Sequence, residues 1–410
     1  MSTYSATTVS ATTAPATGAA TDEAEQLRAE LRAVARDLLA SGAAPSAGTP
    51  SAGERKDDGE ADWAQLAEAG WLGLEVPEQL DGAGVTFAET AVVCQELGRA
   101  AVRAPYLGTA VLGAGVLLAA EPCAGRDELL GALASGAPRL AVALPTGDAA
   151  LGARAAAVSF RLAGGAGGAT TLDGRADFVP DAAGADTLLV PALDEAGAPV
   201  VVRLDPAQPG LEVTETPVLD VSRGVGSVAA AGAVVDPGAV WPLVGDGWSA
   251  LRLLHARAAL AVACDALGVA EAMMETTVAY VGVRQQFGRP IGSFQAVKHG
   301  CADMFIQVSV GRGLVADAVR ALASVGQDVG GATAPDLAED LAAVETAVSR
   351  AKSYVGAAAV DVAGKAMQLH GGIGYTWESG VHRYLKRAAL SRSLFGSPAA
   401  HRARLARRFD

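Results

Sequence analysis

The strongest constraint on the fold is a change of sequence texture in the middle of the chain. Between residues 139 and 242 the sequence consists of short runs rich in β-forming residues, such as LAVAL, DTLLVPAL and PVVVRL, interrupted by Gly, Pro and Asp. On both sides the apolar residues recur at helical spacing instead. This order predicts an α+β protein with an N-terminal helical domain, a small β domain of about seven strands and a C-terminal four-helix bundle.

The same transitions predict the domain boundaries. We expect a disordered tail over 1–21, a helical domain over 22–138, a β domain over 139–242 and the bundle over 243–410. The first residues are too small and polar to pack. They also lack the charged start and apolar centre of a secretion signal.

Composition excludes several kinds of partner. The formal charge is −13 and the body of the chain has no basic stripe, so neither nucleic acid nor an anionic membrane surface is expected as a partner. No apolar run is expected to reach the length of a membrane span. The cysteines are far apart, without metal-binding spacing, and fit buried thiols in a reducing compartment, so we expect no metal site and a cytoplasmic location. They are Cys94, Cys123, Cys264 and Cys301.

Two motifs in the last third indicate a site: RQQFGRPIGSFQAVKH at 284–299 and QLHGGIGYTWES at 368–379. A glycine after a helix end supplies the left-handed backbone that stops the helix, which accounts for only one glycine of the second motif. A dinucleotide pyrophosphate needs a fixed cation and unhindered backbone N–H groups, and Arg284 with Gly371 and Gly372 would supply both. Phe287 would add a flat apolar face.

Each of these residues also has a purely structural interpretation. Arg284 could be a charge at a helix end, and Gln295 an exposed helix residue. His370, next to a helix C-terminus, fits a capping histidine whose hydrogen bonds are satisfied. Only the two motifs together favour a cofactor site.

The motifs and the α–β–α order, with LAEAGWLGLEVPEQLDGAG and the ELGRA that follows, resemble the acyl-CoA dehydrogenase family over nearly the whole chain after residue 22. The resemblance implies FAD, bound mainly by the neighbouring subunit across a dimer interface. It also implies oxidation of an acyl thioester to the 2,3-unsaturated product and an electron-accepting flavoprotein. Arg257 would contact the substrate. The implied cofactor residues are Arg284, Phe287, Gln295, Gln368, Gly371, Gly372 and Ser397.

The sequence departs from the family where catalysis requires a carboxylate. Removal of the proton alpha to a thioester needs a general base, which the family commonly carries as the Glu of a Y-E-G-T pattern. This chain reads SRSLFGSP there, with Phe395 in place of the Glu. The second position that family members use, on the first bundle helix, is Ala258. Ala143, Leu144 and Phe178 also replace residues that usually contact the flavin and the substrate.

Three interpretations remain open. In the preferred one, the chain resembles the subunits of heteromeric bacterial members that complete the cofactor site while a partner chain carries the base. Alternatively, a self-sufficient homo-oligomer uses an unusual base, such as Asp265, His255 or Glu378. In the third, the chain is a scaffold that kept the fold and lost the chemistry.

Overall fold

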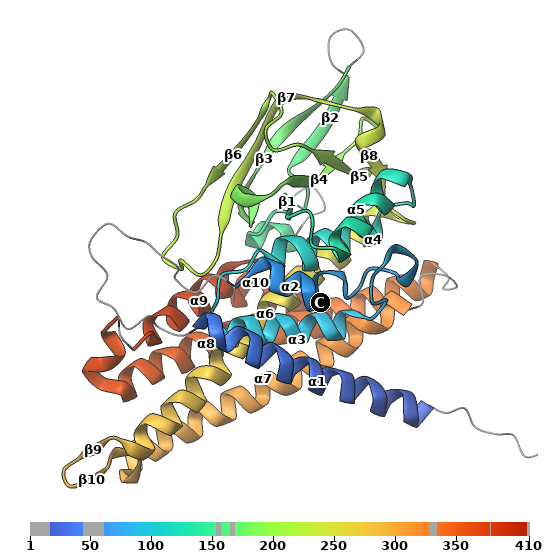
Figure 1. The fold of residues 1–410 in the computed structure, drawn as a ribbon. Helices are drawn as coiled ribbons and strands as arrows, with labels where there is room; N and C mark the ends of the chain where they lie inside the picture. Colours follow the sequence, from blue (N-terminus) through green and yellow to red (C-terminus); the bar gives the residue numbers. More distant parts are fainter. Residues whose placement is uncertain are drawn as a thin grey trace, which may run out of the picture.

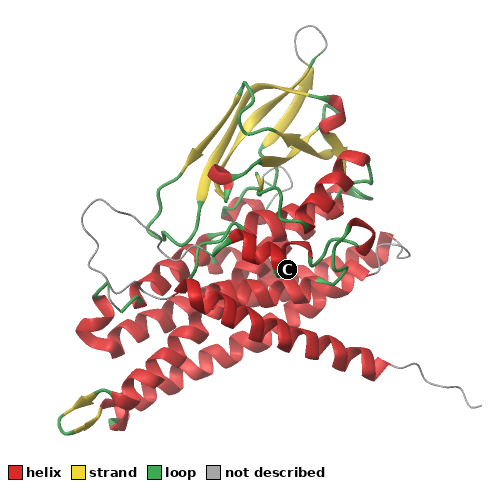
Figure 2. Ribbon diagram, in the orientation of Figure 1, coloured by secondary structure: helices red, strands yellow, loops and turns green. Residues whose placement is uncertain are grey.

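The computed structural model describes residues 17–43, 61–152, 157–164, 169–327, 334–377 and 379–407. Long helices form one layer of the molecule, and a single large sheet stands on one side of it (Figure 1). Figure 2 shows that the strands gather in that one region, apart from a small hairpin at the far end of the helices. The predicted fold class is confirmed.

The N-terminal region is helical. Its main helices are α1 (Thr17–Ala43), α2 (Trp63–Glu68), α3 (Phe87–Ala100), α4 (Ala114–Ala119) and α5 (Ala124–Ala134), with a π-helix at Leu107–Gly113. A capping box starts α3: Ala88 N–H donates to the Thr86 side chain, and Thr86 N–H donates to Glu89. The helix α1 packs on α3, and Arg28 pairs with Glu89 at 3.1 Å.

The boundary of the predicted tail needs a correction. Residues 1–16 lie outside the described residues, but residues 17–21 belong to α1. Ala19 and Ala20 are strong helix formers and precede a stretch rich in Glu, Leu and Arg, so the helix extends further than its apolar pattern indicated.

Within the described residues the central sheet has eight strands, in the order β6-β7-β3-β2-β4-β5-β8, with β1 pairing parallel to β4. The strands are β1 (Leu140–Val142), β2 (Phe160–Gly164), β3 (Thr170–Pro180), β4 (Thr187–Leu193), β5 (Pro199–Leu204), β6 (Leu211–Glu215), β7 (Val225–Val235) and β8 (Val240–Pro242). The prediction of about seven strands is close to this number, and the β-rich runs read as strands in the sequence included neither β2 nor β8. A second apolar core lies within this sheet and includes Phe160, Leu188 and Val228.

The C-terminal region is the predicted helical bundle. It consists of α6 (Gly247–Val283), α7 (Gln295–Gln327), α8 (Ala334–His370) and α9 (Val381–Ser393), followed by the short α10 (Pro398–Ala406). The helix α8 packs against α6, α7, α9 and α10. A short hairpin, β9 (Gln285–Gln286) and β10 (Arg289–Pro290), joins α6 to α7. One apolar core runs through the bundle and the N-terminal helices.

One expectation about membranes was wrong. By length and composition α6 could cross a membrane, because its most apolar 18-residue window contains at most two charged residues. That window is 94% buried inside the protein, however, and the central helix of a folded core passes the same test. The apolar character of α6 is therefore explained by its central place in the bundle.

Candidate functional site

The helices that lead into the two sequence motifs are in contact at one end of the bundle. The rings of Tyr280 and His370 stack with centroids 4.4 Å apart, and the Tyr280 hydroxyl donates to the His370 carbonyl at 3.4 Å. This contact joins the C-terminal end of α6 to that of α8. His370 is buried, and its Nδ1 lies 2.8 Å from the Ala366 carbonyl, so the interpretation of His370 as a satisfied histidine is confirmed.

The first motif forms an exposed turn. Arg284 caps α6 in an extended conformation, and β9 and β10 follow, joined by a two-residue turn. Both turn residues are left-handed, Phe287 at φ +53° and Gly288 at φ +77°, as hairpins of this length favour. The Phe287 ring is 90% exposed. A bulky aromatic residue in a left-handed turn is strained and gains little burial here, and within the chain its ring contacts the ring of Phe294, with centroids 6.1 Å apart.

The three glycines of the second motif have different explanations. Gly371 follows the last residue of α8 at φ +63°, as a helix stop requires. A Cβ on Gly374 would lie 2.6 Å from the Met367 carbonyl oxygen, so close packing excludes a side chain there. Gly372 has no positive φ, and a Cβ added to it would meet no atom within 4 Å. The fold does not require Gly372, so its exposed backbone is available to a ligand.

These exposed groups have the chemistry of a dinucleotide site. Arg284, Gln295 and Gln368 are exposed, and their side chains make no hydrogen bond or ion pair with other described residues. A guanidinium, two amides, an aromatic face and unhindered backbone N–H groups fit a pyrophosphate joined to an aromatic base. The residues present therefore fit the predicted cofactor. Among the described residues, no group of three or more His, Cys, Asp or Glu could hold a metal.

Ser397 lies elsewhere, at the start of α10. Its hydroxyl accepts the Ala400 N–H at 3.2 Å and donates to Asp148 Oδ2 at 2.8 Å, while its N–H donates to Asp148 Oδ1 at 2.7 Å. Figure 1 places α10 beside the sheet and the β9–β10 hairpin at the far end of the bundle. One chain therefore does not unite Ser397 with the Arg284 group.

Both positions where the family places its base are apolar and buried. Ala258 on α6 is 0% exposed and Phe395 is 2% exposed, and both belong to the same apolar core. Neither side chain can accept a proton. Phe395 also has a left-handed backbone, at φ +55°.

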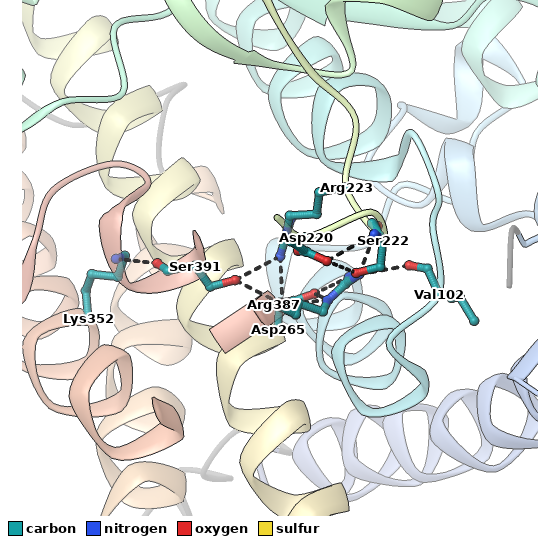
Figure 3. A network of polar contacts seen from close by, with 8 residues as sticks. All are labelled: Val102, Asp220, Ser222, Arg223, Asp265, Lys352, Arg387 and Ser391. Carbon is teal, nitrogen blue, oxygen red and sulfur yellow. Dashed lines mark hydrogen bonds and ion pairs between the residues drawn. The ribbon is translucent and has the colours of Figure 1, made fainter. Parts of the chain in front are cut away.

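The structure gives no support to Asp265 as an alternative base. Its carboxylate is buried in a network with Arg223 and Arg387, each at 2.6 Å (Figure 3). Burial alone would raise the pKa of Asp265, but the two arginines outweigh it and hold that pKa below its usual value. A carboxylate that is ionised and held by two cations is a weak base. Its physical role is to join α6 to α9 and to the loop before β7.

The other two candidate bases gain no support. His255 is 5% exposed, and burial lowers its pKa to about 4. Such a histidine binds a proton too weakly to abstract one efficiently near neutral pH. Glu378 lies outside the described residues.

The predicted substrate contact of Arg257 stays a prediction, but the structure gives this residue partners within the chain. Its guanidinium forms a bidentate pair with Glu75 at 2.7 and 2.5 Å, and its Nε donates to the Val111 carbonyl at 2.7 Å. Thr90 donates to the same carboxylate. These contacts use the polar groups of Arg257 inside the protein. Sequence reasoning missed Glu75, although its charge within the apolar segment WLGLEVPE was a signal of a buried partner.

The sheet contributes one exposed aromatic residue. Phe178 sits at an irregularity of β3, between Ala176 and Val179, with φ +55° and a side chain 45% exposed. A bulge of this kind turns a side chain out of the sheet. Ala143 and Leu144, in contrast, are completely buried, so their side chains are core residues.

Comparison with known proteins identifies the class defined by this fold. The acyl-CoA dehydrogenase N-terminal domain matches residues 21–137, and the acyl-CoA dehydrogenase C-terminal domain matches residues 245–409. The chain is 31% identical over 370 residues to acyl-CoA dehydrogenase IpdE2 of Mycobacterium tuberculosis, covering 88% of this chain and 90% of that protein. The chain belongs to the acyl-CoA dehydrogenase family of flavoprotein oxidoreductases.

Solved structures agree with this assignment. A structure titled Tcur3481-Tcur3483 steroid ACAD G363A variant matches with a TM-score of 0.75 and 28% identity, covering 93% of this chain and 97% of that chain. The ChsE4-ChsE5 complex of Mycobacterium tuberculosis matches with a TM-score of 0.73 and 27% identity, over 93% and 96% of the two chains. Butyryl-CoA dehydrogenase of Megasphaera elsdenii, at 22% identity and a TM-score of 0.77 over 93% and 97%, shares the fold.

Proposed function

We propose that this chain is the FAD-binding subunit of a heteromeric acyl-CoA dehydrogenase whose partner chain supplies the catalytic base. The observation that carries the proposal is a contrast within the described residues: the cofactor groups at the bundle end are exposed and unpartnered, and both base positions are apolar and buried. The reaction would convert an acyl thioester to its 2,3-unsaturated product. A missing general base typically costs about 10²–10⁴-fold in rate, so the isolated chain should be almost inactive.

Each exposed group at the bundle end has a role in binding. The Arg284 guanidinium and the backbone N–H groups at Gly371 and Gly372 would hold the pyrophosphate, with Phe287 against an adenine face. Gln295 and Gln368 would donate or accept hydrogen bonds at the ends of the dinucleotide. When bound, FAD supplies the acceptor for the hydride that leaves the beta carbon. The proton from the alpha carbon has no acceptor at residue 395 or 258.

A partner chain is needed for a second reason. Several large apolar side chains are exposed on the bundle, and exposed apolar patches mark protein contacts. They include Val283, Phe287, Phe305, Ile306, Tyr375 and Trp377. Beside Ile306, a groove of about 520 Å³ runs between α7 and α8, lined by Asp303, Gln307, Asp361 and Lys365 among others.

Two of the similar structures are named as pairs of chains, Tcur3481-Tcur3483 and ChsE4-ChsE5. We extend that arrangement to this chain: it pairs with another acyl-CoA dehydrogenase chain, passes electrons to a flavoprotein acceptor and works in the cytoplasm. Because one similar structure is titled a steroid enzyme, thioesters of steroid acids belong in the substrate panel.

The test is co-expression of this chain with neighbouring family members that carry an intact Y-E-G-T motif. The complex is purified through a tag on this chain, its flavin content is measured, and dye reduction is followed with short-chain, long-chain and steroid acyl-CoAs. The proposal expects a yellow heteromer that reduces the dye, and a single chain that does not. Robust dehydrogenation by the chain alone would overturn it in favour of an internal base, and a flavin-free protein would favour a scaffold.

A further inference from the structure

A buried lysine holds the segment that carries Phe395. Lys352 lies on α8 and is 0% exposed. Its Nζ donates to the carbonyls of Ser391 at 2.9 Å, Arg392 at 3.2 Å and Gly396 at 3.0 Å. Among the described residues no carboxylate lies within ion-pair distance of it. A buried ammonium is costly unless its protons are all hydrogen-bonded, and here three carbonyls provide that compensation.

The three carbonyls belong to two different structures. Ser391 and Arg392 lie in the last turn of α9, where carbonyls have no partner within the helix and the helix dipole is negative. Gly396 belongs to the loop between α9 and α10. Lys352 therefore ties the end of a helix to the loop that follows it. Figure 3 shows Lys352 reaching Ser391 from the opposite side to the Asp265 network.

The loop that Lys352 holds is strained. Phe395 and Gly396 are both left-handed, with φ +55° and +98°. His401 lies beneath them: its Nε2 is 3.0 Å from the Phe395 carbonyl and its Nδ1 is 3.2 Å from the Ser349 hydroxyl. A left-handed non-glycine residue persists only where the surrounding structure fixes it. Ser349 and Lys352 are three residues apart on α8, so one helix face supports the loop at two points.

The sheet domain holds the loop from the other side. Gly396 N–H donates to the Thr146 carbonyl at 3.3 Å, and Asp148 accepts from Ser397 twice. A Cβ on Gly396 would lie 2.4 Å from Leu151 and 2.8 Å from His401, so a side chain there has no room. The segment 394–397 is thus clamped between α8 and the residues 146–151.

We propose that Lys352 is a positioning residue, whose ammonium fixes the segment 394–397 in one conformation against the sheet domain. The direction of the side chain at 395 is set by this clamp and not by the residue that occupies the position. In the context of the proposed function, on which this step rests, the clamp keeps Phe395 inserted in the core and closes the space that a thioester would need in this subunit. The anchoring itself requires neither a cofactor nor a partner.

The experiment uses Lys352→Met in the full chain, which keeps an unbranched side chain only one heavy atom shorter and removes the charge and all donors. The matched control is Lys298→Met, the same change at an exposed position of α7. Amide hydrogen exchange is measured across 388–400, together with tryptic cleavage after the exposed Arg392. We expect exchange at Gly396 and Ser397 and cleavage after Arg392 to rise about tenfold or more in Lys352→Met alone. Peptides from the buried centre of α6 should be unchanged.

Two further variants keep the test decisive. Lys352→Arg restores a cation with several donors and should recover part of the protection, which a purely packing role would not explain. If Lys352→Met fails to fold, Ser349→Ala tests the second contact between α8 and the loop, because it removes the hydroxyl that orients His401. Loop exchange unchanged in the folded variants, or raised equally throughout α6 and α8, would overturn the proposal. Flavin content and dye reduction of the complex test the proposed function separately.

Discussion

The hydrogen bonding of polar groups differs between two regions: the end of the bundle around Arg284 and the loop around Phe395. At the bundle end, the side chains of Arg284 and Gln368 are exposed and make no hydrogen bond or ion pair with other described residues. In the loop, Ser397, Gly396 and the Phe395 carbonyl are all hydrogen-bonded within the chain. A region that binds a ligand leaves its donors open, whereas a region that only holds structure uses them internally.

The glycines of the two regions also differ in the space around them. A side chain on Gly372 would meet no atom within 4 Å, whereas one on Gly396 would collide with Leu151 and His401. The first glycine leaves room for something outside the chain, and the second is required by packing inside it. In the proposed function, the bundle end around Arg284 binds the cofactor, and the position where family members carry the base is occupied by an apolar core residue.

The largest effect on the free energy of unfolding is expected from placing a carboxylate in the loop around Phe395. Phe395→Glu puts a charge at a position 2% exposed and removes aromatic packing, so it should lower the free energy of unfolding by about 3–5 kcal/mol. Phe395→Leu, which stays apolar, should cost clearly less. Denaturant unfolding measures both. We also expect at most slight acyl-CoA turnover from Phe395→Glu, and strong turnover with normal stability would show that the loop still borders an open substrate site.

The second effect concerns FAD binding at the end of the bundle around Arg284. Charge-assisted hydrogen bonds contribute about 1.5–3 kcal/mol each, so Arg284→Ala should weaken FAD binding by roughly 10–100-fold for each bond lost. Since Arg284 has no partner within the described chain, the unfolding midpoint of the flavin-free protein should stay unchanged. Arg320→Ala, on the exposed face of α7, is the control. Flavin-to-protein ratios after gel filtration decide the result, and unchanged flavin content would remove the cofactor assignment.

A third, smaller effect appears with pH and belongs to the loop. Burial lowers the pKa of Lys352 to about 7, with smaller contributions from Asp148, which raises it, and Arg223, which lowers it. An unfolded lysine titrates near a pKa of about 10.4, so between these values the unfolded chain holds a proton that the folded chain has released. Stability should therefore rise above pH 7, with a slope of at most about 1.4 kcal/mol per pH unit from this group. Above pH 7 the clamp therefore rests on the two N–H donors of the neutral amine, and below pH 7 on the three of the ammonium.

Lys352→Met should remove that contribution, while Lys298→Met should retain it. Burial lowers the pKa of the neighbouring His401 to about 4, so His401 stays neutral throughout this window and does not complicate the comparison. Denaturant midpoints at pH 7, 8 and 9 provide the measurement. Parallel curves for the wild type and Lys352→Met would mean that Lys352 keeps its proton in the folded state.

Sequence reasoning recovered what depends on local pattern. Helical periodicity and the two motifs identified the bundle and the Arg284 group, because those signals lie within short windows. It failed where a residue's meaning depends on distant partners: Arg257 meets Glu75, and Asp265 meets Arg223 and Arg387, only after folding. Short strands such as β8 gave no periodic signal at all.

The smallest effect on stability is expected from adding one methyl group at the bundle end. Gly372→Ala should change the free energy of unfolding by less than about 0.5 kcal/mol, because the new Cβ enters open space and the backbone is not left-handed. Gly374→Ala, two residues away, should cost about 1–3 kcal/mol because its Cβ would press on the Met367 carbonyl. FAD binding should show the reverse order: Gly372→Ala should weaken it by hindering approach to the backbone N–H groups, measured by titrating the flavin-free protein with FAD. If Gly372→Ala binds FAD as tightly as the wild type, this glycine is not part of the cofactor site. The proposed cofactor site at the bundle end then depends on Arg284 and its neighbours alone.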